Sequence, residues 1–238
     1  MKVRYVIKYT KESNIKFVGH LDLLRTLQRI IRRADLPVDF SKGFNPHMSV
    51  SIAQPLSVGM YSGGEYMDIV FTEKVSTDII KKKLVENAPS GIKILDVFKI
   101  REAENNEKIP QTMALIDGAR YTIKIKYKDT SKIDVTFKTL LNEDSWMILK
   151  KTKSGENVVN IKPMIKTIEY SIQDSILMLK VLLSCGSKEN LSAELFSQFI
   201  KENMIGADND AFVDIKREEM YAYKDKKLVS LSEYVISM

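Results

Sequence analysis

Apolar and polar positions alternate with two different periods along the first hundred residues, and these periods predict the secondary structure. Residues 3–9 alternate and are rich in β-branched and aromatic side chains, which is typical of a strand. Residues 21–34 instead repeat leucine and isoleucine every three or four positions, which predicts a helix with one apolar face. The same criteria predict strands at 48–54, 65–72 and 92–100 and a second helix at 78–87. The predicted order is therefore β-α-β-β-α-β.

A similar pattern recurs after residues 101–111, a charged stretch that breaks the apolar periodicity and is interpreted as a linker. The predicted elements beyond it are strands at 119–127, 145–152 and 212–224, a hairpin at 167–184, helices at 131–142 and 190–203, and a short tail at 227–236. The sequence thus predicts an α+β fold of two tandem ferredoxin-like (βαββαβ) units with antiparallel sheets. The domains are expected at 1–104 and 112–238. Right-handed crossovers would place both helices of a unit on one face of its sheet.

Net charge is concentrated near the amino terminus. The 238 residues carry 37 Lys and Arg against 31 Asp and Glu, a formal net charge of +6. Residues 1–50 alone hold ten of the basic and four of the acidic side chains, so this fifth of the chain accounts for the whole excess. Such a concentration indicates a polyanionic partner and says nothing about fold.

Arginines follow the polar face of the first predicted helix. Arg25, Arg29 and Arg32 lie about one turn apart, at a spacing of about 4.5–6 Å, and Arg33 lies to one side. This spacing is comparable to that of phosphates along one nucleic-acid strand. A solvated helix face is the alternative interpretation, and Asp22 is placed to pair with Arg25.

A turn-rich segment, SKGFNP at 41–46, follows this helix. Lys42 and Asn45 are candidate RNA contacts within it. Phe44 could stack on a nucleobase or could equally fill the edge of the core.

Few residues suggest catalysis. His20, Asp22 and His47 are weak candidates for acid–base chemistry, but the helix is about 20 Å long and would keep the two histidines apart unless the loop folds back along it. With one cysteine, Cys185, and two histidines, neither a disulfide framework nor a classical metal site is expected, and no cofactor is predicted. No apolar run is long enough to cross a membrane, so a cytoplasmic protein is expected.

Several motifs in this region resemble one family. GHLDLLR (19–25), FSKGFNPH (40–47) and QPLSVGMYSGGEYMDI (54–69) look like the radical-SAM-linked protein family, a bacterial domain of unknown function encoded beside or fused to radical S-adenosylmethionine proteins. The resemblance is strongest over 1–100 and continues more weakly through 160–170 and 214–221. In the family pattern a proline follows the histidine, where this chain has Met48. The resemblance implies a radical SAM protein as partner and a context of translation and RNA metabolism.

The function predicted is that of an RNA-binding accessory protein, acting with a radical SAM enzyme in tRNA or rRNA modification. The chain lacks a CxxxCxxC motif and so would not hold the iron–sulfur cluster itself. Two alternatives stay open. One is an RNA-modifying or RNA-cleaving enzyme, since tandem ferredoxin-like units also look like TruA-type pseudouridine synthases and CRISPR-associated endoribonucleases, although the sequence hallmarks of both are absent. The other is an adaptor that binds protein only.

Overall fold

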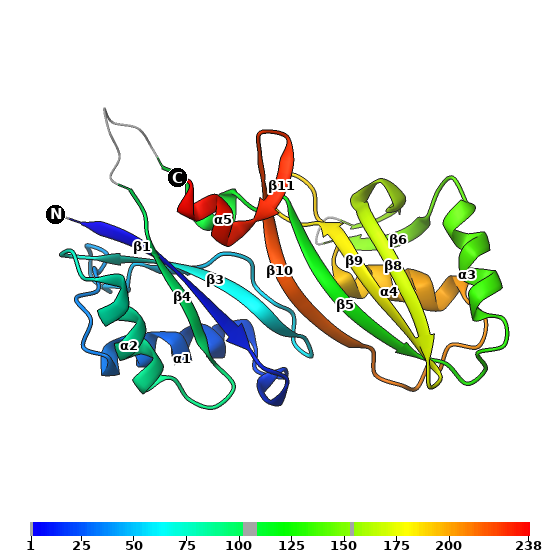
Figure 1. The fold of residues 1–238 in the computed structure, drawn as a ribbon, viewed down its shortest axis with the longest axis horizontal. Coiled ribbons are helices and arrows are strands. Elements are labelled where there is room, and N and C mark those ends of the chain that lie inside the picture. The colour runs from blue at the N-terminus through cyan, green and yellow to red at the C-terminus, as the bar shows by residue number, and fades with distance from the viewer. Residues whose placement is uncertain (1, 102–108, 153–154) are drawn as a thin grey trace. The chain divides into compact units, whose positions relative to one another are not determined.

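The computed structural model describes residues 2–101, 109–152 and 155–238 (Figure 1). It is a mixed α+β structure with a mostly antiparallel sheet. The chain forms two compact units, one of residues 1–116 together with 219–238 and the other of residues 117–218. Among the described helices, none is long and apolar enough to span a membrane.

The first unit is built on strands that are distant in sequence. Its elements are β1 (Val3–Lys11), α1 (His20–Arg33), β2 (Val50–Ile52), β3 (Tyr61–Phe71), α2 (Thr77–Asn87), β4 (Ile94–Lys99), β11 (Lys227–Ser230) and α5 (Leu231–Ile236). β1 is the central strand, with β4 on one side and β3 on the other, and β2 pairs with β3. The observed order β1-α1-β2-β3-α2-β4 follows the predicted β-α-β-β-α-β order closely.

The core of this unit lies between the sheet and its first two helices. Figure 1 shows α1 and α2 on the same side of β1, β3 and β4. The odd-numbered side chains of β1, among them Tyr5 and Ile7, point into this core, as do Leu27 and Ile31 of α1. Tyr5 also ties down the segment before α2, because its hydroxyl donates to Val75 O at 2.7 Å and accepts from Val75 N at 2.9 Å.

The opposite face of the same sheet carries polar side chains that are paired. Lys8 Nζ lies 2.5 Å from Glu219 Oε2, and the Tyr66 hydroxyl donates to Glu219 Oε1 at 2.8 Å. Glu219 begins the carboxyl-terminal segment that belongs to this unit. These contacts give a physical reason why the last part of the chain packs with the first unit, whereas the sequence placed all of 112–238 in the second.

Asp68 lies on the same face and is 3% exposed. Its Oδ2 accepts a hydrogen bond from Thr112 N at 2.9 Å, and its Oδ1 lies 3.7 Å from Arg4 Nε. Burial raises the pKa of Asp68 above its ordinary value, because desolvation outweighs the hydrogen bond from Thr112 and the charge of Arg4. The predicted linker 101–111 falls mainly on residues 102–108, outside the described residues.

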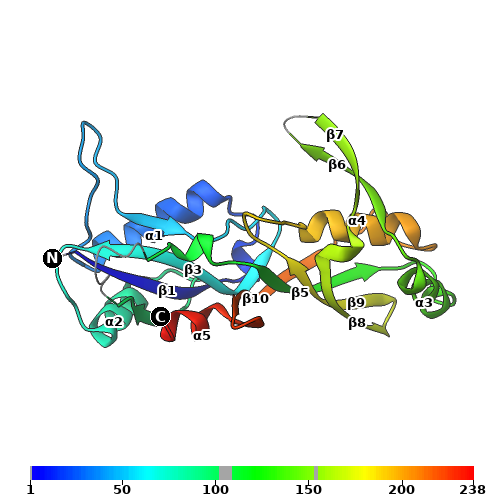
Figure 2. The same ribbon diagram turned by 90° about the horizontal axis from the view of Figure 1, so that it is seen from above.

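The strands of the second unit lie in the order β10-β5-β9-β8, and β9 pairs antiparallel with both β5 and β8. Its elements are β5 (Gly118–Lys126), α3 (Ile133–Asn142), β6 (Met147–Thr152), β7 (Gly155–Asn160), β8 (Ile165–Gln173), β9 (Ile176–Ser184), α4 (Ala193–Asn203) and β10 (Asp214–Lys224), of which β10 continues into the first unit. Figure 2 shows α4 covering one side of β5 and β9. The ring of Trp146 stacks on Phe199 of α4 in this core, with 4.9 Å between centroids.

The strand predicted at 145–152 is confirmed as β6. It pairs with β7 in a separate two-stranded sheet (Figure 2). Met147 and Leu149 are exposed while the intervening Ile148 is buried. The strand therefore has one buried side, and its sequence does not identify the sheet to which it belongs.

Candidate nucleic-acid interface

The polar face of α1 presents the four predicted arginines to solvent. Leu23, Leu27, Ile30 and Ile31 of this helix are buried, whereas Arg25, Arg29, Arg32 and Arg33 are all exposed. The helix is strongly amphipathic because its apolar residues recur every three to four positions and fix which side faces the sheet. The arginines are therefore held on a rigid element, with their guanidinium groups outside the core.

Few of these guanidinium groups are engaged within the protein. Arg25 Nη1 lies 3.0 Å from Asp22 Oδ1, an exposed pair three residues apart. Arg33 Nε donates to the backbone oxygen of Arg29 at 3.4 Å. Across the described residues, no ion pair involves Arg29 or Arg32. Arg32 and Arg33 also lie in the last helical turn, where a cation interacts favourably with the helix dipole.

The loop between α1 and β2 is closed at its base by backbone contacts. Phe40 and Met48 form an isolated antiparallel bridge. Ser41 N donates to His47 O at 2.8 Å, and His47 N donates back to Ser41 Oγ at 2.9 Å. Figure 2 shows the chain between α1 and β2 extending away from the strands of its unit. We call residues 40–48 the projecting loop.

Every side chain from Ser41 to His47 in the projecting loop is exposed. Phe44 has a relative exposure of 108%, so it does not fill the edge of the core, which was one of the two predicted roles. Gly43 adopts φ = +137°, a conformation that L side chains rarely adopt. Lys42 and Asn45 flank Phe44 in sequence, which leaves an aromatic ring, a cation and an amide available in one short loop.

The side chain of Asp39 holds the base of the projecting loop. Lys2 Nζ donates to Asp39 Oδ2 at 2.7 Å, and Ser49 Oγ donates to the same oxygen at 3.0 Å. The hydrogen bond from Lys2 lowers the pKa of Asp39 below its ordinary value, with a further contribution from Ser49, against the opposing effect of burial. Asp39 N also donates to Val70 O of β3 at 2.8 Å, so the loop is fastened to the sheet.

The three weak catalytic candidates do not lie together. His20 is the first residue of α1, and the adjacent segment contacts the end of the sheet near Lys11, where Gly59 N donates to Lys16 O at 2.9 Å. His47 lies beyond the other end of the sheet, past the Val38–Phe71 bridge. The length of β1 separates these ends by about 26 Å. Nδ1 of His20 is screened from solvent and has no hydrogen-bond partner.

Asp22 is exposed and is engaged by Arg25 rather than by either histidine. A shared acid–base site for His20, Asp22 and His47 is therefore not formed in this structure, because general acid–base groups must lie within hydrogen-bond reach of one substrate. In the described ranges, no three His, Cys, Asp or Glu side chains gather closely enough to hold a metal ion.

Sequence reasoning did not single out a group of lysines in the second unit. Lys124 and Lys126 alternate with Ile123 and Ile125 along β5, and Lys180 lies opposite Thr122 on β9. The signal was present as the run IKIK, in which strand geometry places every second side chain on the same face. Counting net charge over long segments concealed it, because acidic residues elsewhere in the unit cancel the lysines.

Comparison with protein families identifies the chain. Residues 4–193 match the family model described as an uncharacterized protein conserved in bacteria, DUF2344. The chain belongs to the DUF2344 family. The match includes α1 and the projecting loop, so both lie inside the family's domain. No curated protein matches the chain.

Solved structures offer only distant likenesses. A chain of the crystal structure of a Cbf5-Nop10-Gar1 complex aligns with a TM-score of 0.49 and 13% identity, over 91% of this chain and 48% of that one. An unknown protein from Galdieria sulphuraria aligns with a TM-score of 0.26 and 10% identity, over 91% of this chain and 99% of that one. The chain thus spans about half the length of the first, and likenesses at these scores carry no functional conclusion.

Proposed function

We propose that this protein binds structured RNA, tRNA or rRNA, through the exposed arginine face of α1 and the projecting loop. In this proposal Arg25, Arg29, Arg32, Arg33 and Lys42 contact phosphates, and Phe44 and Asn45 contact bases. The observation that carries the proposal is that α1 presents four guanidinium groups to solvent, of which one has a carboxylate partner. Arginine binds phosphate in a bidentate fashion and also stacks on bases, so this surface suits RNA.

The finer architecture and the partner belong to the same proposal. We propose that both units are ferredoxin-like, since α1 and α2 in the first and α3 and α4 in the second connect strands of the sheet, and the strand order β10-β5-β9-β8 has the first strand next to the last. The RNA would be presented to a radical SAM enzyme that modifies it. The motifs GHLDLLR and FSKGFNPH support this partner through their resemblance to the radical-SAM-linked family. The single cysteine, Cys185, is buried, which fits an accessory role in which the partner holds the cluster.

Salt-dependent binding tests the proposal. The full chain is titrated against fluorescently labelled tRNA and rRNA fragments at several salt concentrations, and the slope of log affinity against log salt is measured. Each phosphate contact contributes about 0.7–0.9 to that slope. Arg29→Gln together with Arg32→Gln should therefore reduce the slope by about 1.4–1.8.

Lys132→Gln is the matched control, because Lys132 is an exposed cation at the start of α3 and its loss changes the net charge by the same amount per residue. Its slope should equal that of the unmodified protein. An unchanged affinity and slope after the arginine substitutions would refute RNA binding by α1. Capture of protein that survives nuclease treatment, in the absence of RNA binding, would instead favour the protein-only adaptor.

A further inference from the structure

The sheet of the second unit has one face that its helices do not cover. Along β5, Tyr121, Ile123 and Ile125 are buried toward α4, and the alternate residues point the other way. The outward residues are exposed or half-buried. We call them the open face: Thr122, Lys124 and Lys126 of β5, Ile176, Met178 and Lys180 of β9, and Glu169, Ser171 and Gln173 of β8.

Strand register arranges these side chains in three rows across the sheet. Lys124 is paired with Met178, which is paired in turn with Ser171. The rows on either side are Lys126–Ile176–Gln173 and Thr122–Lys180–Glu169. Neighbouring strands are about 4.8 Å apart and alternate residues along a strand about 7 Å apart, so the rows form a compact grid.

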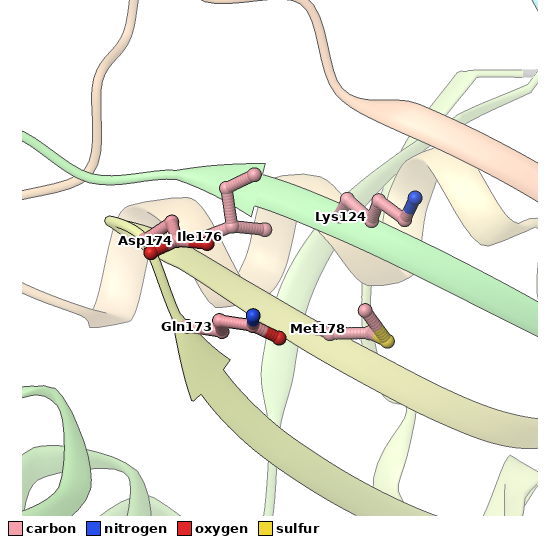
Figure 3. Close-up of a pocket in the computed structure, with 5 residues that line it drawn as sticks. All are labelled: Lys124, Gln173, Asp174, Ile176 and Met178. Atoms are coloured by element: carbon pink, nitrogen blue, oxygen red, sulfur yellow. The ribbon is translucent and has the colours of Figure 1, made fainter.

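Two shallow hollows lie on this grid on either side of Met178. One, of about 160 Å³, is lined by Lys124, Gln173, Asp174, Ile176 and Met178 (Figure 3). The other, of about 150 Å³, is lined by Glu169, Tyr170, Ser171, Met178 and Lys180. The Tyr170 ring is not free to stack on a ligand, because it packs on Phe137 with centroids 4.6 Å apart. Met178 lines both hollows, and its side chain is an apolar thioether.

Charge on the open face is predominantly positive. Lys124, Lys126 and Lys180 form no ion pair with any described residue, and Lys126 and Lys180 are exposed. Two carboxylates lie beside them: Glu169 is directly opposite Lys180, and Asp174 lines the same hollow as Lys124. Glu218 is already engaged, since it accepts from Thr122 Oγ1 at 2.8 Å and pairs with Lys216 at 2.6 Å.

We propose that the open face binds a single-stranded segment of RNA, with bases over Met178 and Ile176 and phosphates at the three lysines. This rests on the proposed RNA-binding function and names the form of RNA that the second unit takes. A flat sheet surface accepts bases that are splayed out of a helix, and sulfur contacts aromatic rings favourably. The Gln173 amide and the Ser171 hydroxyl lie beside the apolar positions and supply donors and acceptors for base edges.

The test uses the full chain and labelled single-stranded oligouridine, with a duplex RNA of equal length for comparison. Lys124→Gln with Lys180→Gln should lower the salt slope for the single strand by about 1.4, from two contacts of about 0.7 each, and weaken its binding. Glu169→Gln should strengthen binding to the same oligonucleotide, because it removes the carboxylate opposite Lys180. Lys132→Gln again serves as the control and should change neither value.

Two results would overturn the proposal: single-strand binding that is absent or unaffected by the double substitution, or an equal loss for duplex RNA. Arg29→Gln with Arg32→Gln separates this proposal from the preceding one, since it should weaken tRNA binding and leave oligouridine binding nearly intact. Photocrosslinking of oligouridine followed by peptide mass spectrometry should place the label on the peptide containing Met178, and a label confined to α1 would contradict the assignment. All variants lie on exposed or half-buried positions, and thermal unfolding checks that each is folded.

Discussion

Replacing Asp22 by asparagine should strengthen the proposed RNA binding and lower the stability of the folded protein. Asp22 Oδ1 lies 3.0 Å from Arg25 Nη1, and the two side chains are 68% and 64% exposed. If the arginine face binds RNA as proposed, this carboxylate competes with phosphate for Arg25 and adds a negative charge to that face. In the free protein it pairs with Arg25 and lies in the first helical turn, where an anion is favourable.

The magnitude follows from the exposure of the pair. An exposed ion pair contributes about 0.2–1 kcal/mol, so releasing Arg25 should increase affinity by about 1.4-fold to 5-fold. If Arg25 then gains a phosphate contact, the salt slope should rise by up to about 0.9. The free energy of unfolding should fall by about 1 kcal/mol, because the interaction with the helix dipole and the ion pair with Arg25 are both lost.

Fluorescence anisotropy with labelled tRNA at several salt concentrations measures the binding change, and urea unfolding measures the stability change. Asp35→Asn is the matched control, because Asp35 is an exposed carboxylate just beyond the other end of α1 with no ion pair among the described residues. It removes the same charge and should give a smaller gain. A loss of affinity in Asp22→Asn, or a gain equal to that of Asp35→Asn, would refute the competition between Asp22 and phosphate for Arg25.

Three further predictions concern stability, each measured by urea unfolding. Tyr5→Phe should cost about 1–3 kcal/mol, because it removes two hydrogen bonds to the backbone of Val75, and an effect below the measurement error would contradict that pairing. Gly91→Ala should cost more than Gly43→Ala: both have positive φ, but the added methyl at Gly91 would lie 2.7 Å from Ile15 Cγ2 and that at Gly43 meets nothing. Because the pKa of Asp68 is raised on folding, the native state binds more protons between the unfolded and folded pKa values, so this group's contribution to stability falls as pH rises through that window. Asp68→Asn should remove that slope, and an identical pH profile for the two proteins would count against it.

The spacing of apolar residues predicted the helices in which one face is buried. The helix expected at 21–34 is observed at His20–Arg33, and that expected at 78–87 is observed at Thr77–Asn87. β7, Gly155–Asn160, was not predicted because its residues GENVVN are exposed or half-buried and show no apolar alternation. The tail at 227–236 proved to be a strand followed by a helix. Its capping box of Ser230 and Glu233 was readable in the sequence as S-x-x-E.

Exposure of a loop residue was the least predictable property of the candidate site. The turn residues Gly43 and Pro46 indicated a loop, but a loop can lie against the core or stand away from it. What places Phe44 in solvent is the pairing of Phe40 with Met48 and the anchoring of Asp39 to Val70. The contact of Asp39 with Val70 joins residues far apart in sequence, so the pattern around Phe44 alone could not distinguish base stacking from core filling.

The distribution of charge shows a second limit of interpreting the sequence by segments. Summed over the sequence, the excess of positive charge falls entirely within residues 1–50, which drew attention to α1 alone. A ligand, however, encounters a face and not a segment, and in a strand only every second residue belongs to that face. On the open face three lysines stand beside two carboxylates, Glu169 opposite Lys180 and Asp174 at the hollow that Lys124 lines, although the unit around them is nearly balanced. Summing charge over the residues that share one face of a predicted helix or strand therefore locates both cationic surfaces. Summing charge over sequence segments locates only the first.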